Sequence, residues 1–95
     1  MALTDLVVII KVMEHHIRKR ELYAVNHGDY VGQMFAVIAV HKDNVSCLSM
    51  PSMENVEVPL DKFDLGRNSD IITLVEKLSR DIWKTCEAQY NKNNK

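Results

Sequence analysis

Four histidines and two cysteines are the side chains of this 95-residue sequence that are best suited to bind a metal ion or act as a nucleophile. His15 and His16 are adjacent, and adjacent helical residues point about 100° apart, so the two imidazoles are poorly placed to share one metal ion. Cys47 could be a nucleophile with His27 or His41 as its base, but no surrounding motif supports such a pair. We therefore expect no metal, no cofactor and no enzymatic activity.

Two glycines precede the most apolar run of the chain, in the segment NHGDYVGQMFAVIAV of residues 26–40. A phosphate-binding loop places its glycines between a strand and a helix, so that backbone amides and the helix N-terminus face the anion. The residues after Gly32 favour a strand instead. We therefore expect Gly28 to occupy a turn with positive φ, and Gly32 to bend or bulge a strand.

A protein-interaction surface is the main remaining class of site. Met50 and Met53 lie on either side of Pro51, and methionine side chains either adapt to irregular partner surfaces or fill gaps in a core. Glu54 and Glu57 follow as part of an acidic rim. We expect these two methionines and two glutamates to contact a partner protein, with one of the methionines packed in the core.

The basic run Arg18, Lys19 and Arg20 defines an alternative site. At the end of a helix these cations would face the negative pole of the helix dipole. They could instead contact nucleic acid or an acidic partner, with Tyr23 and Tyr30 stacking on bases.

Composition limits these alternatives. With 46% apolar and 26% charged residues, the chain resembles one globular domain rather than a disordered or fibrous protein. The formal net charge of −1 divides into +2, −5 and +2 over residues 1–20, 21–66 and 67–95. Phosphate binding depends on a net basic face, so this charge layout disfavours nucleic acid as the partner.

The cysteines and the apolar N-terminal run indicate in which cellular compartment the protein acts. Cys47 and Cys86 are too few for a disulfide scaffold in a short chain, so we expect two reduced thiols. Residues 6–13 are too short to span a bilayer and lack the features of a signal peptide. These observations predict a cytoplasmic protein without membrane contact, and they do not define its oligomeric state.

Helical spacing and a capping signal predict how the chain begins. Thr4 and Asp5 form a helix start, and the apolar residues after them recur every three or four positions. This pattern predicts an N-terminal helix over about residues 5–20. The run LVVIIKV within it is rich in β-branched residues, which favour a strand.

From Glu21 the pattern becomes that of short strands separated by polar turns. The predicted sheet covers about residues 21–59, and a helical turn follows at residues 60–63. A C-terminal helical region is predicted over about residues 69–90, unless Ser79 caps a second helix and breaks the first. Residues 91–95 have no apolar anchor and are expected to fray.

This order of elements predicts one α+β domain spanning residues 1–95. It consists of an N-terminal helix, a small, strongly bent antiparallel sheet of SH3-like or partial-barrel type, and a C-terminal helix or helix pair. No convincing fifth strand follows residues 60–63, so whether the sheet closes is left open.

Several runs resemble short proteins of T-even-type tailed bacteriophages, including those of cyanobacteria. These runs are GDYVGQMFAVI, LSMPSMENVEVP, KFDLG and VEKLSRDIWKTCEAQY, within about residues 27–90. The resemblance implies a small accessory protein in the host cytoplasm and transfers no functional residue. One departure is Ser79, where relatives would carry a proline. We therefore expect a non-enzymatic modulator that binds a host or phage protein, with a nucleic-acid-binding module as the alternative.

Overall fold

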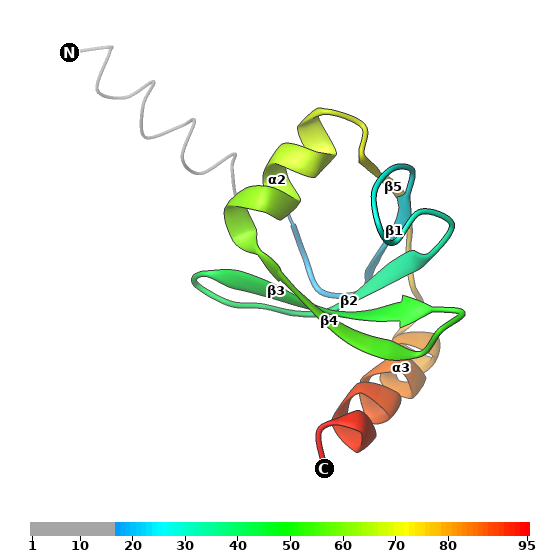
Figure 1. The fold of residues 1–95 in the computed structure, drawn as a ribbon. Helices are drawn as coiled ribbons and strands as arrows, with labels where there is room; N and C mark the ends of the chain where they lie inside the picture. The colour runs from blue at the N-terminus through cyan, green and yellow to red at the C-terminus, as the bar shows by residue number, and fades with distance from the viewer. Residues whose placement is uncertain (1–16) are drawn as a thin grey trace, which may run out of the picture.

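The computed structural model describes residues 17–95, which form a sheet and two helices (Figure 1). Along the chain the elements are β1 (Glu21–Val25), β2 (Met34–Val40), β3 (Asn44–Met50), β4 (Glu54–Pro59), α2 (Leu60–Asn68), β5 (Ile72–Lys77) and α3 (Arg80–Asn93). Neither helix of this described region is long and apolar enough to cross a membrane.

The strands form one antiparallel sheet in the order β4-β3-β2-β1-β5, so β4 and β5 are its edges. The predicted α+β class and antiparallel sheet are confirmed. The pairing register shifts between Val37 and Ala39 in β2, and between Leu22 and Tyr23 where β1 meets β5. An unpaired extra residue bends a strand locally, so these irregularities curve the sheet.

Each face of the sheet carries its own core cluster and its own helix (Figure 1). Side chains alternate across a strand, so β3 directs Val45 and Cys47 to the first cluster and Leu48 to the second. Phe63 of α2 packs into the first cluster, and Trp83 of α3 packs into the second. Because helices cover both faces, the central strand β2 is apolar almost throughout.

The predicted order of elements is wrong, because strands come first in the described chain and a helix separates β4 from β5. The predicted helix over residues 5–20 lies mostly outside the described residues, and residues 17–20 form no helix. Arg20 has a positive φ of 78°, and its N–H donates to the Val37 carbonyl at 2.9 Å. The chain therefore enters β1 through a turn bonded to the sheet. An N-terminal helix before an SH3-like or partial-barrel sheet and a C-terminal helix or helix pair is not the observed arrangement.

The predicted C-terminal helical region is also wrong in its first part, because β5 occupies residues 72–77. Leu74 and Val75 fitted a helical apolar face, but they are 47% and 46% exposed. Ile72 and Thr73 are β-branched residues, which favour strands. The free edge of β1 supplies the pairing partner, and the Asn26 N–H donates to the Ile71 carbonyl at 2.8 Å where this pairing begins.

α3 begins directly after Ser79, the residue that could cap a second helix according to the sequence. The Ser79 hydroxyl accepts a hydrogen bond from the Ile82 N–H at 3.3 Å. The Trp83 Nε1–H donates to the Val37 carbonyl at 2.9 Å, which fixes the helix on the sheet. α3 continues to Asn93, three residues into the predicted tail of residues 91–95.

Candidate functional site

A groove of about 610 Å³ lies beside α2, between β4, the loop of residues 26–33 and the start of β5. Its lining includes five side chains of the first core cluster: Val25, Phe35, Val56, Phe63 and Ile72. An apolar hollow of this size with a few polar groups at its rim is typical of a binding site. The groove is therefore the candidate functional site.

The loop of residues 26–33 forms one wall of the groove, and two glycines shape it. Gly28 and Gly32 have φ angles of 94° and 88°, which side chains other than hydrogen disfavour. The Gly32 N–H donates to the Val25 carbonyl at 3.1 Å and turns the loop back towards β1. Tyr30 packs edge-on against Phe35 with ring centroids 5.5 Å apart. Gly28 occupies a turn as predicted, whereas Gly32 ends the loop before β2 instead of bending a strand.

Charged side chains surround the groove. Asp29 brings a carboxylate to it, and His27 and Lys62 bring nitrogen atoms. Glu57 also lines the groove, but its carboxylate bonds to Ser46 and to Tyr90 of α3, on the other face of the sheet. A second hollow lies on the other side of Leu65, which lines both. The charged residues of that second hollow are Lys42, Asp43, Asp61 and Asp64. Carboxylates outnumber cations in the second hollow, where Asp64 also pairs with Arg67 at 3.6 Å. The side of the molecule next to the groove therefore favours a basic partner.

The four predicted protein-interaction residues occupy different environments. Met50 is half-buried and packs against the second core cluster, under α3. Met53 is 47% exposed in the turn between β3 and β4. Glu54 is exposed next to it, and Glu57 lines the groove. The turn and the edge strand β4 therefore keep three of the four residues on the surface.

Glu57 also joins β4 to its neighbours. Its carboxylate accepts hydrogen bonds from Ser46 Oγ at 2.6 Å, from Asn44 Nδ2 at 2.5 Å, and from the Tyr90 hydroxyl of α3. His41 Nε2 lies 3.0 Å from Ser46 Oγ and extends this network. These donors hold the Glu57 side chain in one orientation and fix a negative charge on β4.

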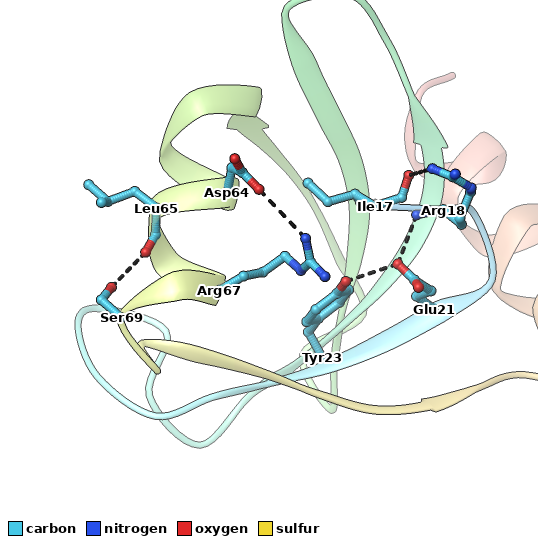
Figure 2. Close-up of polar contacts among 8 residues, drawn as sticks. All are labelled: Ile17, Arg18, Glu21, Tyr23, Asp64, Leu65, Arg67 and Ser69. Carbon is cyan, nitrogen blue, oxygen red and sulfur yellow. Dashed lines mark hydrogen bonds and ion pairs between the residues drawn. The ribbon is translucent and has the colours of Figure 1, made fainter. Parts of the chain in front are cut away.

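The two tyrosines predicted to stack on bases are not placed beside the basic run. Tyr23 is fully buried, and its hydroxyl donates to Glu21 Oε1 at 2.9 Å (Figure 2). Burial and the contact with Glu21 raise the pKa of this hydroxyl, so it stays neutral. Its ring packs edge-on against Phe63 at 5.0 Å, and the Arg67 guanidinium lies 5.8 Å from the ring centroid. Tyr30 belongs to the groove wall.

The basic run lies beside the start of α3. Lys19 Nζ is 5.3 Å from the centroid of the Trp83 ring, and Arg20 Nε donates to the Leu78 carbonyl at 3.1 Å. The Arg18 backbone N–H donates to the Glu21 carboxylate at 2.8 Å (Figure 2). The predicted nucleic-acid residues are therefore divided between the core, the groove and this basic surface.

The cysteines lack the properties of a nucleophile. Cys47 is buried in the first core cluster and Cys86 in the second, so the two free thiols lie on opposite faces of the sheet. Burial raises the pKa of both thiols, and the charge of Glu57 raises that of Cys47 further. The reactive form of cysteine is the thiolate, which such surroundings suppress at neutral pH.

Metal-binding side chains are likewise dispersed. Within residues 17–95 no group of three or more histidine, cysteine, aspartate and glutamate side chains is arranged to hold a metal ion. His15 and His16 lie outside the described residues.

No model of a known protein family, no curated protein and no solved structure matches the chain. The resemblance to short proteins of T-even-type tailed bacteriophages therefore stays a prediction. The candidate site rests on its own geometry, an apolar groove with carboxylates around it.

The groove is not predictable from local sequence patterns, because its lining comes from segments that meet only in the folded chain. Leu65 lies beyond the helical turn predicted at residues 60–63, and α2 instead continues to Asn68. Only Leu60 and Phe63 show helical spacing there, and the Gly66 that follows disfavours a helix, so the sequence carries little signal for the longer one. The meeting of the 26–33 loop with the start of β5 has no comparable signal.

Proposed function

We propose that the chain is a small non-enzymatic protein-binding module, which accommodates an apolar side chain of a partner protein in the groove beside α2. The observation that carries this proposal is the open groove of about 610 Å³ with an aromatic and aliphatic lining. Apolar hollows on small domains are typical contact sites for partners. The carboxylates around the groove favour a partner segment in which lysine or arginine lies near the apolar residue.

The sequence resemblance supports an accessory role. If the chain is encoded by a phage, its partner is a host or phage protein and it acts in the host cytoplasm. Two free thiols are in keeping with a reducing compartment.

Leu65 is the most informative position for a test. It lines the groove and is 65% exposed, so its replacement leaves the core intact. Selection of a random peptide library on the full chain should enrich peptides with an apolar residue near lysine or arginine. Leu65→Arg should weaken their binding about tenfold or more, or about 1.4 kcal/mol, because the new cation repels a basic peptide and removes an apolar contact. Fluorescence anisotropy of labelled peptides measures the change in Kd.

Ile82→Arg is the matched control. Ile82 is 55% exposed on α3 and does not line the groove, so this variant adds the same charge to a helix surface elsewhere. Its Kd should equal that of the unmodified chain. The proposal is refuted if no peptide is enriched, or if the two variants weaken binding equally.

A further inference from the structure

The groove runs along the outer edge of β4. Four consecutive residues of this strand, Val56–Pro59, line it. Successive side chains of a strand point to opposite faces of the sheet, so four residues in a row meet one hollow only along the edge of the strand. β3 occupies the inner edge of β4, and β4 is the last strand of the sheet. The groove therefore borders the edge that no strand of the sheet covers.

The direction of the backbone groups on β4 follows from the register. The Leu60 N–H donates to the Asp43 carbonyl at 2.9 Å, one position beyond the pairing of Pro59 with Asn44. In an antiparallel ladder, residues alternate between bonding to the neighbouring strand and pointing away from it. Val58 and Val56 therefore bond to β3, whereas the alternate residues of β4 direct their backbone groups outward.

The hydrogen bonds of the neighbouring strand β3 show independently which residues of β4 point outward. The Asn44 carbonyl accepts from the His41 N–H at 2.8 Å, on the side of β2. A residue of a central strand bonds to one neighbour only, so Asn44 does not bond to Pro59, opposite it on β4. The outward-facing residues of β4 are therefore Asn55, Glu57 and Pro59.

The outward backbone groups of Asn55 and Glu57 have no backbone partner within residues 17–95, since no strand of the sheet lies beyond β4. Asn55 and Glu57 each offer an N–H and a carbonyl. Pro59 offers neither, because proline has no N–H and its carbonyl, at the N-cap of α2, accepts the first hydrogen bond of that helix. A row of unpaired backbone groups at a sheet edge is a template for another strand.

The opposite edge of the sheet, β5, is irregular, and it borders the groove only at its first residue. The pairing of β1 with β5 passes from Glu76 to Leu74, which leaves Val75 without a partner. Such a bulge interrupts an edge and hinders further strand pairing. No residue of β5 beyond Ile72 lines the groove. Only β4 combines a regular edge with an adjacent apolar hollow.

We propose that the partner binds as an extended segment that pairs with the outer edge of β4, an inference that rests on the proposed function of the groove. Alternate side chains of this segment enter the groove and contact Phe35 and Phe63. The carboxylates of Asp29, Glu54 and Glu57 lie on the groove and on β4, so they favour lysine or arginine at neighbouring positions. The expected partner is thus an extended basic peptide with apolar residues at alternate positions.

Methylation of the peptide backbone tests this mode of binding without altering the protein. The probe is the tightest-binding peptide from the library selection, and each of its backbone amides is methylated in turn. Pairing with β4 predicts a loss of about tenfold or more at every second residue, because alternate N–H groups of a strand face its neighbour. The residues between them should show little change.

A pair of variants tests the protein side. Glu57→Pro removes the outward N–H at the middle of the edge and leaves the ladder with β3 intact, since that ladder does not use this N–H. Glu57→Ala is the matched control, because it removes the same carboxylate and its contacts with Ser46 and Tyr90 but keeps the N–H. Glu57→Pro should bind the peptide about tenfold or more weakly than Glu57→Ala. Circular dichroism establishes whether each variant is folded.

The outcomes separate the two proposals. A peptide that is sensitive to Leu65→Arg but shows no two-residue alternation on methylation overturns strand addition and leaves the groove as the binding site. Failure of any peptide to bind overturns the proposed function together with this inference. If Glu57→Pro does not fold, the methylation series alone decides.

Discussion

Met53 holds a backbone conformation that its side chain disfavours. Its φ of 60° lies in the left-handed region, which costs a residue with a Cβ atom about 1 kcal/mol or more. Its N–H donates to the Ser49 carbonyl at 2.7 Å and closes the turn that leads into β4. An exposed apolar side chain on a strained residue, next to the edge strand of the groove, is consistent with a role in partner contact.

We predict that Met53→Gly raises the free energy of unfolding by about 0.5–1 kcal/mol. Glycine adopts positive φ without strain, although its greater freedom in the unfolded chain offsets part of the gain. Urea denaturation followed by circular dichroism measures the difference. Met53→Ala is the control, because it removes the side chain and keeps the strained conformation. A glycine variant that is no more stable than the alanine variant would contradict the prediction.

At the scale of elements, Trp83 anchors α3 to the sheet. Its side chain is 7% exposed in the second core cluster, and its Nε1–H donates to the Val37 carbonyl in the central strand. Trp83→Ala should reduce the free energy of unfolding by about 3–5 kcal/mol through the cavity it leaves. Trp83→Phe should cost about 0.5–1.5 kcal/mol, because it removes one hydrogen bond while the Val37 carbonyl keeps the Arg20 N–H as a donor.

Denaturant unfolding of the variants measures these losses, with Ile82→Ala as the control. Ile82 is the preceding residue of α3 and is 55% exposed, so its replacement should change stability by about 0.5 kcal/mol or less. A Trp83→Ala variant as stable as the Ile82→Ala variant would show that α3 does not depend on this anchor.

The sequence predicts elements well where local chemistry decides them. Turn residues and alternation located the strands from Glu21 to Pro59, and the Ser79 hydroxyl indicated the start of α3. The segment IITLVEK did not reveal β5, because its apolar residues satisfy both helical and extended spacing. The unpaired edge of β1 decides between the two, and that edge exists only once the hairpin of β1 and β2 has formed.

The candidate site was predictable to a smaller extent. Met53, Glu54 and Glu57 were identified from sequence as contacts for a partner protein and lie in or next to β4, but the sequence did not indicate that this strand borders a groove. The groove beside β4 requires the pairing order of the sheet and the position of α2. Both depend on contacts between residues far apart in the sequence, which local patterns do not encode.

At the scale of the whole molecule, folding separates the charges. Carboxylates outnumber cations at the hollow beside the groove. The basic run of residues 18–20 instead lies against the segment from the end of β5 to the start of α3, since Glu21 pairs with Lys77 and Arg20 contacts Leu78. That segment adds the cations Lys77, Arg80 and Lys84, against the carboxylates Glu76 and Asp81. Any contact with nucleic acid would therefore use a surface distinct from the groove.

We predict that this basic surface binds single-stranded DNA only at low salt. Tyr23 is buried and Tyr30 lines the groove, so neither of the predicted stacking residues lies with the cations. Phosphate contacts then supply the affinity, which falls steeply as salt rises. Fluorescence anisotropy of a labelled oligonucleotide should show binding at about 20 mM salt and none at about 150 mM, where charges are screened within about 8 Å.

Two lysine variants locate the contact on α3. Lys84→Glu should weaken the low-salt binding, because Lys84 is exposed near the start of α3, beside which the basic run lies. Lys92→Glu makes the same charge change in the last turn of α3, whose end contacts β4, and should have a smaller effect. Binding that persists at about 150 mM salt and depends on Lys84 would instead favour nucleic acid as the partner, because phosphate contacts alone do not survive such screening in a chain of net charge −1.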